Sequence, residues 1–437
     1  AADRASAQRA LSGWVGGRGM TLFRQARLID PASNHDDIGA LRVRGGEIVE
    51  IASDLAPLDG EDVIELDGKA LAPALIDMRV ETSLSAGGVA GLARTAEAAA
   101  AGGLGTLVIQ PRPGLARPEA FAAIEAAALE GPVNLLAAGL LVDEAGELGE
   151  AGLMMRAGAA MLGDGGRPLR DTALLRRALS YASTFDAWTS LRAEDADLAA
   201  GTCAHEGDLA MRLGLPARPA AGERLAVERG AVLAELTGAQ ILFDRITTAE
   251  GLAALRQARA RGLEIAASAP ISHLMFNAVD TGGFDARYRL EPPLRDEDDR
   301  LALIAALAEG DIDVIVSDHR ACTGEAKAHP FPEAQAGSAN LEALLPALCT
   351  LAADGRVRLV DALRAVTSTP AQLLGLPQGR LEPGAPADLV VFDPDAPLVY
   401  GRSGLSCRAS SAFEGRRLSG RVLITLVNGV MIHQPAG

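Results

Sequence analysis

The sequence predicts an α/β protein: an eight-stranded parallel (β/α)8 barrel of the TIM type with a small β-sandwich beside it. Three observations predict this fold. The middle of the chain alternates short apolar runs with amphipathic stretches, which is typical of parallel strands and their covering helices. Both ends are rich in short strands separated by Gly, Asp and Asn turns. The 437 residues are enough for both units.

We expect residues 20–72 and 375–437 to form the sandwich and residues 73–374 to form the barrel. The N-terminal strands lie in LFRQARLID, ALRVRGGEIVEIA and DVIELDG, and the C-terminal ones lie in ADLVVFDPD and GRVLITLVNGVMIH, which contains an Asn-Gly turn. Residues 1–19 carry three arginines but no apolar core of a secretory signal. We expect them to be a disordered or loosely packed extension.

Eight apolar segments are the candidate barrel strands. They occupy residues 75–81, 105–111, 134–142, 159–165, 187–195, 240–247, 263–270 and 312–319. The alternative is an open doubly wound sheet, but no Gly-rich phosphate loop follows the first strand. Because the chemistry of a parallel barrel lies at the carboxyl ends of its strands, functional residues are expected there.

Composition narrows the class of protein. The net charge of −16 makes non-specific nucleic-acid binding unfavourable, because phosphate affinity needs clustered Lys and Arg. No apolar run reaches the roughly 20 residues that span a bilayer, so we expect no membrane association. The four cysteines, Cys203, Cys322, Cys349 and Cys407, are far apart and have no zinc-like spacing. The simplest interpretation is a reduced, cytoplasmic protein.

Several long segments resemble one family. The stretch EPPLRDEDDRLALIAALAEGDIDVIVSDH (291–319) resembles the last barrel repeat of dihydroorotases, and APALIDM (72–78), PAQLLGLPQGRLEPGAPADLVVFDPD (370–395) and AFEGRRLSGRV (412–422) resemble other parts of them. The similarity runs from about Met20 to the C-terminus. It implies a barrel of the amidohydrolase superfamily and a zinc-dependent enzyme that opens or closes the dihydroorotate ring in pyrimidine biosynthesis.

The metal ligands implied by this resemblance are absent. Hydrolysis of a stable cyclic amide needs an activated water and a polarised carbonyl, which a metal centre supplies. The family has two His at the end of the first strand, where this chain has Arg79 and Glu81. It has one His after each of strands five and six, where this chain has Arg192 and Arg245. We therefore expect no zinc, no other cofactor and no catalytic residues.

Two acidic residues of the family pattern remain. Asp164 matches the acid after strand four, and Asp318 matches the acid after strand eight that serves as proton shuttle. The alternative is that each is an ordinary structural residue, a solvated carboxylate in a loop or at a helix cap. We interpret seven residues at the strand ends as a vestigial site: Arg79, Glu81, Asp164, Arg192, Arg245, Asp318 and His319.

The substrate positions have changed as well. The family's substrate-binding Arg is replaced near Ser83, and its two Asn are replaced by Arg112 and Glu291. The last His of its DHAPH motif corresponds to Cys322. Loss of metal ligands and substrate contacts together indicates loss of the reaction.

A rebuilt metal site is the alternative. We expect His35 and His433 in the sandwich, His205 and His329 in loops, His273 at best near the barrel mouth, and His319 at the mouth. Magnesium or calcium could instead be bound by a set rich in carboxylates. The candidates are Glu81, Asp164, Asp318 and His319. Such a cluster is more often an ion-pair network.

The residues that replace the family's metal ligands balance the charge of the carboxylates around them. Three arginines (Arg79, Arg192, Arg245) replace ligands in a space that contains three carboxylates (Glu81, Asp164, Asp318). Burying those carboxylates without cations would cost several kcal/mol per ion, and guanidiniums pair well with carboxylates. We therefore predict a salt-bridge network in place of the metals. In the alternative, the arginines extend into solvent and the acids are hydrated.

Three functions remain open. The first is a non-catalytic dihydroorotase-like protein that assembles with aspartate carbamoyltransferase, a partner implied by the resemblance alone, in a homo- or hetero-oligomer. The second is a diverged metal-dependent cyclic amidohydrolase. The third is a regulatory module that holds an anionic metabolite with Arg79, Arg112, Arg192 and Arg245.

Overall fold

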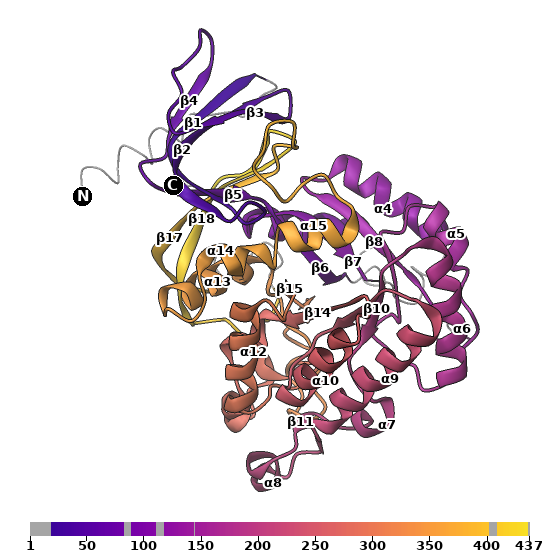
Figure 1. Ribbon diagram of the computed structural model, residues 1–437. Coiled ribbons are helices and arrows are strands. Elements are labelled where there is room, and N and C mark those ends of the chain that lie inside the picture. The colour runs from indigo at the N-terminus through magenta and orange to yellow at the C-terminus, as the bar shows by residue number, and fades with distance from the viewer. Residues whose placement is uncertain (1–18, 83–88, 111–117, 144, 402–408, 436–437) are drawn as a thin grey trace.

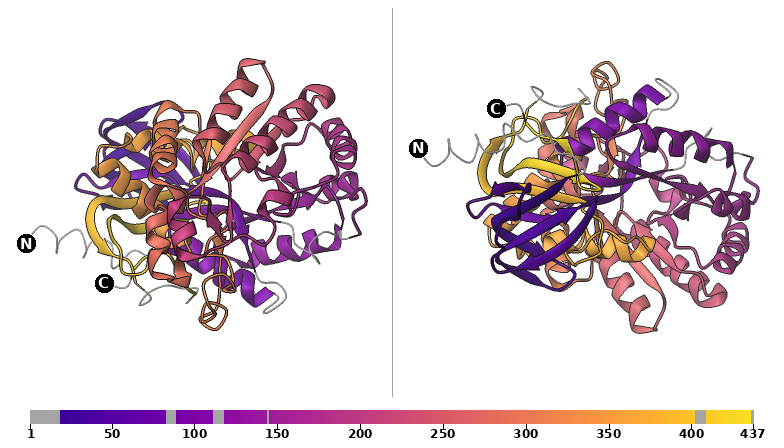
Figure 2. Two further views of the ribbon diagram at one scale, coloured as in Figure 1. Left: turned by 90° about the horizontal axis from the view of Figure 1, so that it is seen from below. Right: turned by 90° about the horizontal axis from the view of Figure 1, so that it is seen from above.

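The computed structural model describes residues 19–82, 89–110, 118–143, 145–401 and 409–435. A parallel barrel surrounded by helices lies beside a β-rich unit, which projects at the top of Figure 1; Figure 2 shows the same arrangement from below and above. The predicted N-terminal extension, apart from its last residue, lies outside the described residues.

The barrel strands follow the predicted segments. They are β6 (Leu75–Glu81), β7 (Leu104–Ile109), β8 (Asn134–Leu140), β9 (Met161–Gly163), β10 (Thr189–Arg192), β13 (Ile241–Asp244), β14 (Ile265–Pro270) and β15 (Val314–Val316). Each pairs in parallel with its neighbour in chain order from β6 to β15. A two-residue strand after β15, β16 (His319–Arg320), pairs with β6 and nearly closes the ring. The predicted fold class is confirmed.

Helices cover the outside of the ring, as Figure 2 shows. The longer ones are α3 (Val89–Ala101), α4 (Pro118–Glu130), α6 (Thr172–Ala182), α9 (Ala221–Thr237), α10 (Ala249–Ala260), α12 (Glu297–Glu309) and α13 (Leu344–Ala353). The shorter ones are α5 (Ala151–Arg156), α7 (Ala196–Ala199), α8 (Asp208–Leu213), α11 (Ile271–Met275), α14 (Leu359–Arg364) and α15 (Ser368–Leu374). Short connecting elements are the 3-10 turns η1 (Ser183–Phe185), η2 (Ala278–Gly283), η3 (Ala286–Tyr288) and η4 (Leu341–Ala343), and strands β11 (Ala204–His205) and β12 (Ala217–Arg218).

Local sequence explains why these helices form where they do. At the start of α6, the side chain of Asp171 accepts hydrogen bonds from the N–H groups of Ala173 and Leu174, which satisfies donors that the helix leaves free. Leu175 and Leu179, four residues apart, bury the same face of the helix.

One glycine allows α9 to approach the barrel closely. A Cβ added at Gly230 would lie 2.6 Å from the ring of Phe243 in β13, so only glycine lets the helix lie flat on that aromatic ring.

The β-rich unit contains strands from both chain ends. They are β1 (Met20–Asp30), β2 (His35–Arg44), β3 (Glu47–Ala52), β4 (Asp62–Glu65), β5 (Ala70–Pro73), β17 (Leu389–Val399), β18 (Arg417–Val427) and β19 (Val430–His433). The long strand β1 pairs with β2 on one edge, and on the other edge with β4 and then β5. Strand β5 pairs with β17, which joins the two ends of the chain. Buried residues from the strands of both chain ends form one core, among them Phe23, Leu41, Leu71 and Leu389.

The barrel interior is a packed core below its mouth. Most of the strands contribute one buried apolar side chain to an inner layer that contains Met78, Val108, Ala138, Met161, Leu242, Ala266 and Val314. This layer fills the barrel as it does in other barrels of this type. The polar residues that follow the strands therefore gather above an apolar floor.

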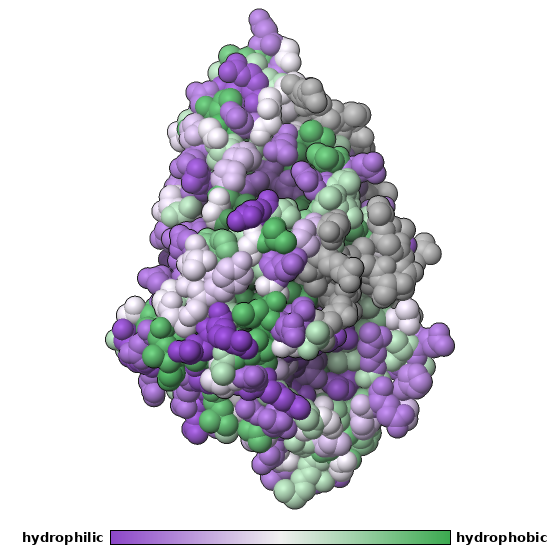
Figure 3. Space-filling view, turned by 90° about the vertical axis from the view of Figure 1, so that its right-hand side faces the viewer, coloured by the Kyte–Doolittle hydropathy of each residue, from purple (hydrophilic) through white to green (hydrophobic). Residues whose placement is uncertain are grey.

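The outer surface is mixed in character. Figure 3, which shows the right-hand side of Figure 1, has hydrophobic and hydrophilic residues intermingled. Among the described helices, none is long and apolar enough to cross a membrane.

An arginine-rich site at the barrel mouth

The carboxyl ends of the barrel strands bring the predicted residues together. Arg79 and Glu81 end β6, and Arg192 ends β10. Arg245 directly follows β13 and has a left-handed backbone, with φ of 63°. Asp318, two residues after β15, has φ of 49°. Left-handed backbone is uncommon for residues other than glycine and costs on the order of 1–3 kcal/mol, so the surrounding contacts must hold these two residues.

The first group of contacts is an inner cluster around Arg79 and Arg245. The Nη2 atom of Arg79 lies 2.9 Å from Glu81, and its Nε lies 3.2 Å from both Asp244 and Asp318. Arg245 donates from Nε to Asp244 at 2.9 Å and from Nη1 to Asp318 at 3.2 Å. Both arginine side chains are at most 4% exposed. Two guanidiniums thus bridge three carboxylates in a solvent-poor space.

Electrostatics in the inner cluster follow from this pairing. Burial alone would raise the pKa of Asp244, but the guanidiniums of Arg79 and Arg245 hold that pKa below its usual value. Burial would lower the pKa of Arg245, yet Asp318 and Asp244 raise it above its usual value. Asp244 and Arg245 therefore each stabilise the charged form of the other.

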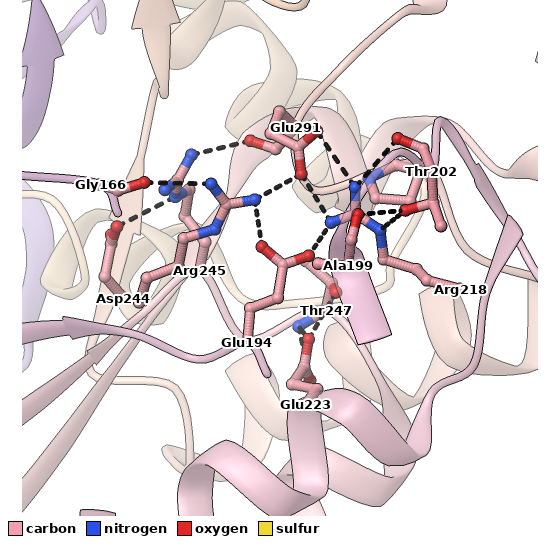
Figure 4. Close-up of polar contacts among 12 residues, drawn as sticks. Gly166, Glu194, Ala199, Thr202, Arg218, Glu223, Asp244, Arg245, Thr247 and Glu291 are labelled. Atoms are coloured by element: carbon pink, nitrogen blue, oxygen red, sulfur yellow. Dashed lines mark hydrogen bonds and ion pairs between the residues drawn. The ribbon is translucent and has the colours of Figure 1, made fainter. Parts of the chain in front are cut away.

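The second group is an outer cluster around Glu194 and Glu291. Arg192 pairs with both glutamates. Arg218 also pairs with both, and its Nη1 lies 2.6 Å from Glu291. Arg289 lies 3.5 Å from the second oxygen of Glu291. Glu194 and Glu291 both point toward Arg218 in Figure 4.

The outer cluster has more cations than anions, and the pKa values reflect this. Burial would raise the pKa of Glu291, but Arg192 and Arg218 lower it to about 2. Burial and then the like charges of Arg245 and Arg79 lower the pKa of Arg192 to about 10. The guanidiniums therefore favour the charged form of Glu291, whereas the positive charge of Arg192 is not fully compensated.

Asp164 differs from the sequence prediction. Its carboxylate accepts hydrogen bonds from the backbone N–H of Arg192 at 2.7 Å and of Gly166 at 2.8 Å. Among the described residues, no guanidinium forms an ion pair with it. The sequence predicts three arginines paired with Glu81, Asp164 and Asp318. In the structure Arg192 pairs with glutamates instead, because Asp164 is turned toward the backbone.

The remaining predicted residues lie in different parts of the structure. Glu291 belongs to the outer cluster, whereas Cys322 is buried in a loop where its thiol lies 3.5 Å from the carbonyl of Ala336. His319 is buried, and burial lowers its pKa to about 4, so it is neutral. Ser83 and Arg112 lie outside the described residues.

The other histidines do not join the site. His35 and His433 lie in the β-rich unit and His329 in a loop, as expected. His205 was expected in a loop but is part of strand β11, with its Nε2 3.5 Å from Asp296. His273 is buried in α11 with its Nε2 3.1 Å from the carbonyl of Pro293.

The residues present do not fit a zinc centre. In the described part of the chain, no group of three or more His, Cys, Asp or Glu is arranged to hold a metal ion. The carboxylate oxygens of the inner cluster already contact guanidiniums. Zinc binds carboxylate oxygen at roughly 2.0–2.2 Å, so a divalent ion on Asp318 would lie within a few ångströms of two fixed positive charges.

Four residues of the site were missed by sequence reasoning. Asp244 directly precedes Arg245 in the segment FDRIT, and Glu194 is two residues after Arg192 in LRAED, so their strand-end positions were a usable signal. Arg218 lies in a two-residue strand of an excursion after β10, and Arg289 lies after η3. Nothing local in the sequence indicates that these two arginines reach the mouth.

Comparison with known proteins gives a consistent set of matches. Residues 68–251 match the family model described as dihydro-orotase-like, and residues 290–432 match the amidohydrolase family model. A dihydroorotase-like protein of Pseudomonas aeruginosa is 36% identical over 94% of this chain and 99% of its own length. A dihydroorotase of Anaplasma phagocytophilum is 32% identical over 94% and 95%. Among solved structures, the L-hydantoinase (dihydropyrimidinase) of Arthrobacter aurescens superposes with a TM-score of 0.83 at 20% identity, covering 95% of this chain and 96% of that one, which shows a common fold.

Proposed function

This chain belongs to the dihydroorotase-like family of amidohydrolases, and from that premise we propose that it is a non-catalytic member in which arginines have replaced the metal centre. One observation carries the proposal. At the strand ends where the family's metal ligands are expected, the guanidiniums of Arg79 and Arg245 lie between Asp244 and Asp318 at 2.9–3.2 Å.

The physical argument concerns charge. Buried carboxylates need cations, and in a metal enzyme the ions supply them. Here two buried guanidiniums supply that charge, and they are held by short contacts on several sides. A guanidinium is a cation without an open coordination position, so it cannot lower the pKa of a water molecule to near neutrality as a metal does. The network stabilises the barrel mouth, and among the described residues it leaves no metal-binding position at which water would be activated.

The first experiment measures metal and turnover on the same sample. The protein is purified without chelator, its metal content is determined by plasma mass spectrometry, and dihydroorotate hydrolysis is assayed beside an active dihydroorotase. We expect well under one metal ion per chain and no turnover above background. Stoichiometric zinc together with turnover would instead establish the second sequence hypothesis, a diverged metal-dependent amidohydrolase.

The proposal extends to a role in assembly. The resemblance to dihydroorotases implies aspartate carbamoyltransferase of pyrimidine biosynthesis as the partner. This part of the proposal rests on the resemblance alone.

The second experiment tests this partner directly. Aspartate carbamoyltransferase from the same organism is produced with and without this chain, and mass and activity are measured after size-exclusion chromatography. We expect a joint peak, and a carbamoyltransferase activity that depends on the chain. Separate elution at micromolar concentrations, with full activity of the transferase alone, would rule the partner out.

A further inference from the structure

A cavity of about 550 Å³ opens beside the outer cluster. It lies between the end of β10, residues 199–202 at the end of α7 and just after it, strand β12 and the segment 289–291. The volume is within the range of roughly 300–1,000 Å³ typical of small-molecule sites. The inner pair of arginines, Arg79 and Arg245, does not line it.

The charged residues that line this cavity are unbalanced. They are Arg170, Arg192, Arg218, Arg289, Glu194 and Glu291, that is, four cations and two anions. The excess of cations is on the cavity side, because the acid-rich inner cluster lies behind it. The pKa of Arg192, lowered to about 10 by burial and by neighbouring arginines, is consistent with incomplete compensation.

Two of these arginines are fixed in place. Arg218 donates from Nε to the hydroxyl of Thr202 at 2.6 Å and from Nη2 to the carbonyl of the same residue at 3.3 Å. Arg192 donates from Nη1 to the carbonyl of Gly166 at 3.1 Å. Figure 4 shows Arg218 held between Thr202 on one side and the glutamates on the other. A wall that is already ordered loses little conformational entropy when a ligand binds.

The other two arginines differ in how firmly they are held. The side chain of Arg170 is 64% exposed, and its ion pair is with Asp197, which is 77% exposed. Since an exposed ion pair contributes little, the guanidinium of Arg170 can turn toward an anion at small cost. The side chain of Arg289 is only 11% exposed, donates from Nη1 to the carbonyl of Leu290 at 2.9 Å and lies 3.5 Å from Glu291, so it belongs to the ordered wall.

We propose that this cavity is a binding site for a small organic dianion, held by the exposed Arg170 at its rim against a fixed wall of Arg192, Arg218 and Arg289. A planar guanidinium donates paired hydrogen bonds to carboxylate and to phosphate groups alike. The chemistry that such ligands share is two negative charges on a compact molecule. Arg170, Arg218 and Arg289 lie outside the former metal positions, whereas Arg192 occupies one of them and Glu291 occupies a former substrate position. The proposal does not rest on the loss of hydrolysis.

Isothermal titration at low ionic strength tests the site on the full chain. The probes are succinate and inorganic phosphate, with acetate as the monoanion. We expect saturable one-to-one binding of at least one dianion, about tenfold or more tighter than acetate, because a second charge-assisted contact is lost with the monoanion. Succinate and phosphate distinguish a carboxylate ligand from a phosphate ligand. Binding should weaken as salt is added.

Two variants and one matched control localise the binding. We expect R289Q and R170Q each to weaken dianion binding, R289Q by about tenfold. Arg170 is exposed, so R170Q keeps the test valid if R289Q does not fold. The control is R356Q, which removes the same charge from an exposed residue that does not line this cavity and should change affinity less than twofold. Absence of saturable binding by either dianion, or equal weakening in R356Q, would overturn the proposal.

Discussion

Replacing Glu291 by glutamine is the sharpest test of the outer cluster. The substitution keeps the shape of the side chain and removes the negative charge that Arg192, Arg218 and Arg289 share. The pKa of Glu291 is about 2 in the folded protein against an ordinary value of 4.5. At roughly 1.4 kcal/mol per pKa unit this corresponds to about 3 kcal/mol of stability at neutral pH. Breaking a buried ion pair costs a similar amount, on the order of 3–5 kcal/mol.

The chain offers a matched control in Glu297. Its pKa is also lowered to about 2, chiefly by the hydrogen bonds from Arg300, but its side chain is 46% exposed. Solvent screens an exposed pair three residues apart, so E297Q should cost at most about 0.5 kcal/mol. The Glu291 side chain is 18% exposed. Both glutamates have a lowered pKa, but one is mostly buried and the other is exposed. Comparing E291Q with E297Q therefore isolates the effect of burial.

The assay is urea unfolding followed by circular dichroism at several pH values. The folded pKa of Glu291 lies below its unfolded value, so its contribution is fully present above about pH 4.5 and is lost as the pH falls toward 2. The gap between wild type and E291Q should be constant near neutrality and shrink across that window. If E291Q costs no more than E297Q at pH 7, the outer cluster does not stabilise the fold and the reasoning is wrong.

Three other predictions follow from the same contacts. R245Q leaves buried carboxylates without one of their cations and should lower the free energy of unfolding by about 3–5 kcal/mol, measured by urea unfolding; a loss below 1 kcal/mol would contradict the bridging role. G230A places a Cβ 2.6 Å from the ring of Phe243 and should cost about 1–3 kcal/mol, whereas G282A, with open space around it, should change the melting temperature little; equal effects would refute the close approach of α9. Adding excess zinc, or removing metal with a chelator, should leave the melting temperature within about 1 °C, because only a ligand that binds the folded state raises stability; a rise that saturates with zinc would count against the arginine replacement.

Much of the fold could be predicted because its signals are local. A strand buried on both faces, such as LIDMRVE in β6, is recognisable from its own apolar run, and all eight such runs became barrel strands in order. The meeting of the two chain ends was also predictable, since each end contained strands with no partner nearby. Strand β5 pairing with β17 is the contact that joins them.

The site was predictable only in part. Residues at strand ends, such as Arg79 and Asp318, could be placed because a parallel barrel brings all carboxyl ends to one side. Their partners could not be assigned in the same way. Asp164 was expected to pair with a guanidinium, but its position after β9 directs its carboxylate to backbone N–H groups instead.

The sequence by itself determined the barrel and the joined ends, because each depends on residue type and on periodicity along a few consecutive residues. That arginines stand where dihydroorotases have histidines was implied by the resemblance to that family. Only the tertiary structure decided which carboxylate each arginine contacts. Arg218 and Glu291 are 73 residues apart, and such a pair forms only when the backbone is already folded around it. The energy of an ion pair depends on distances and burial that no local pattern contains.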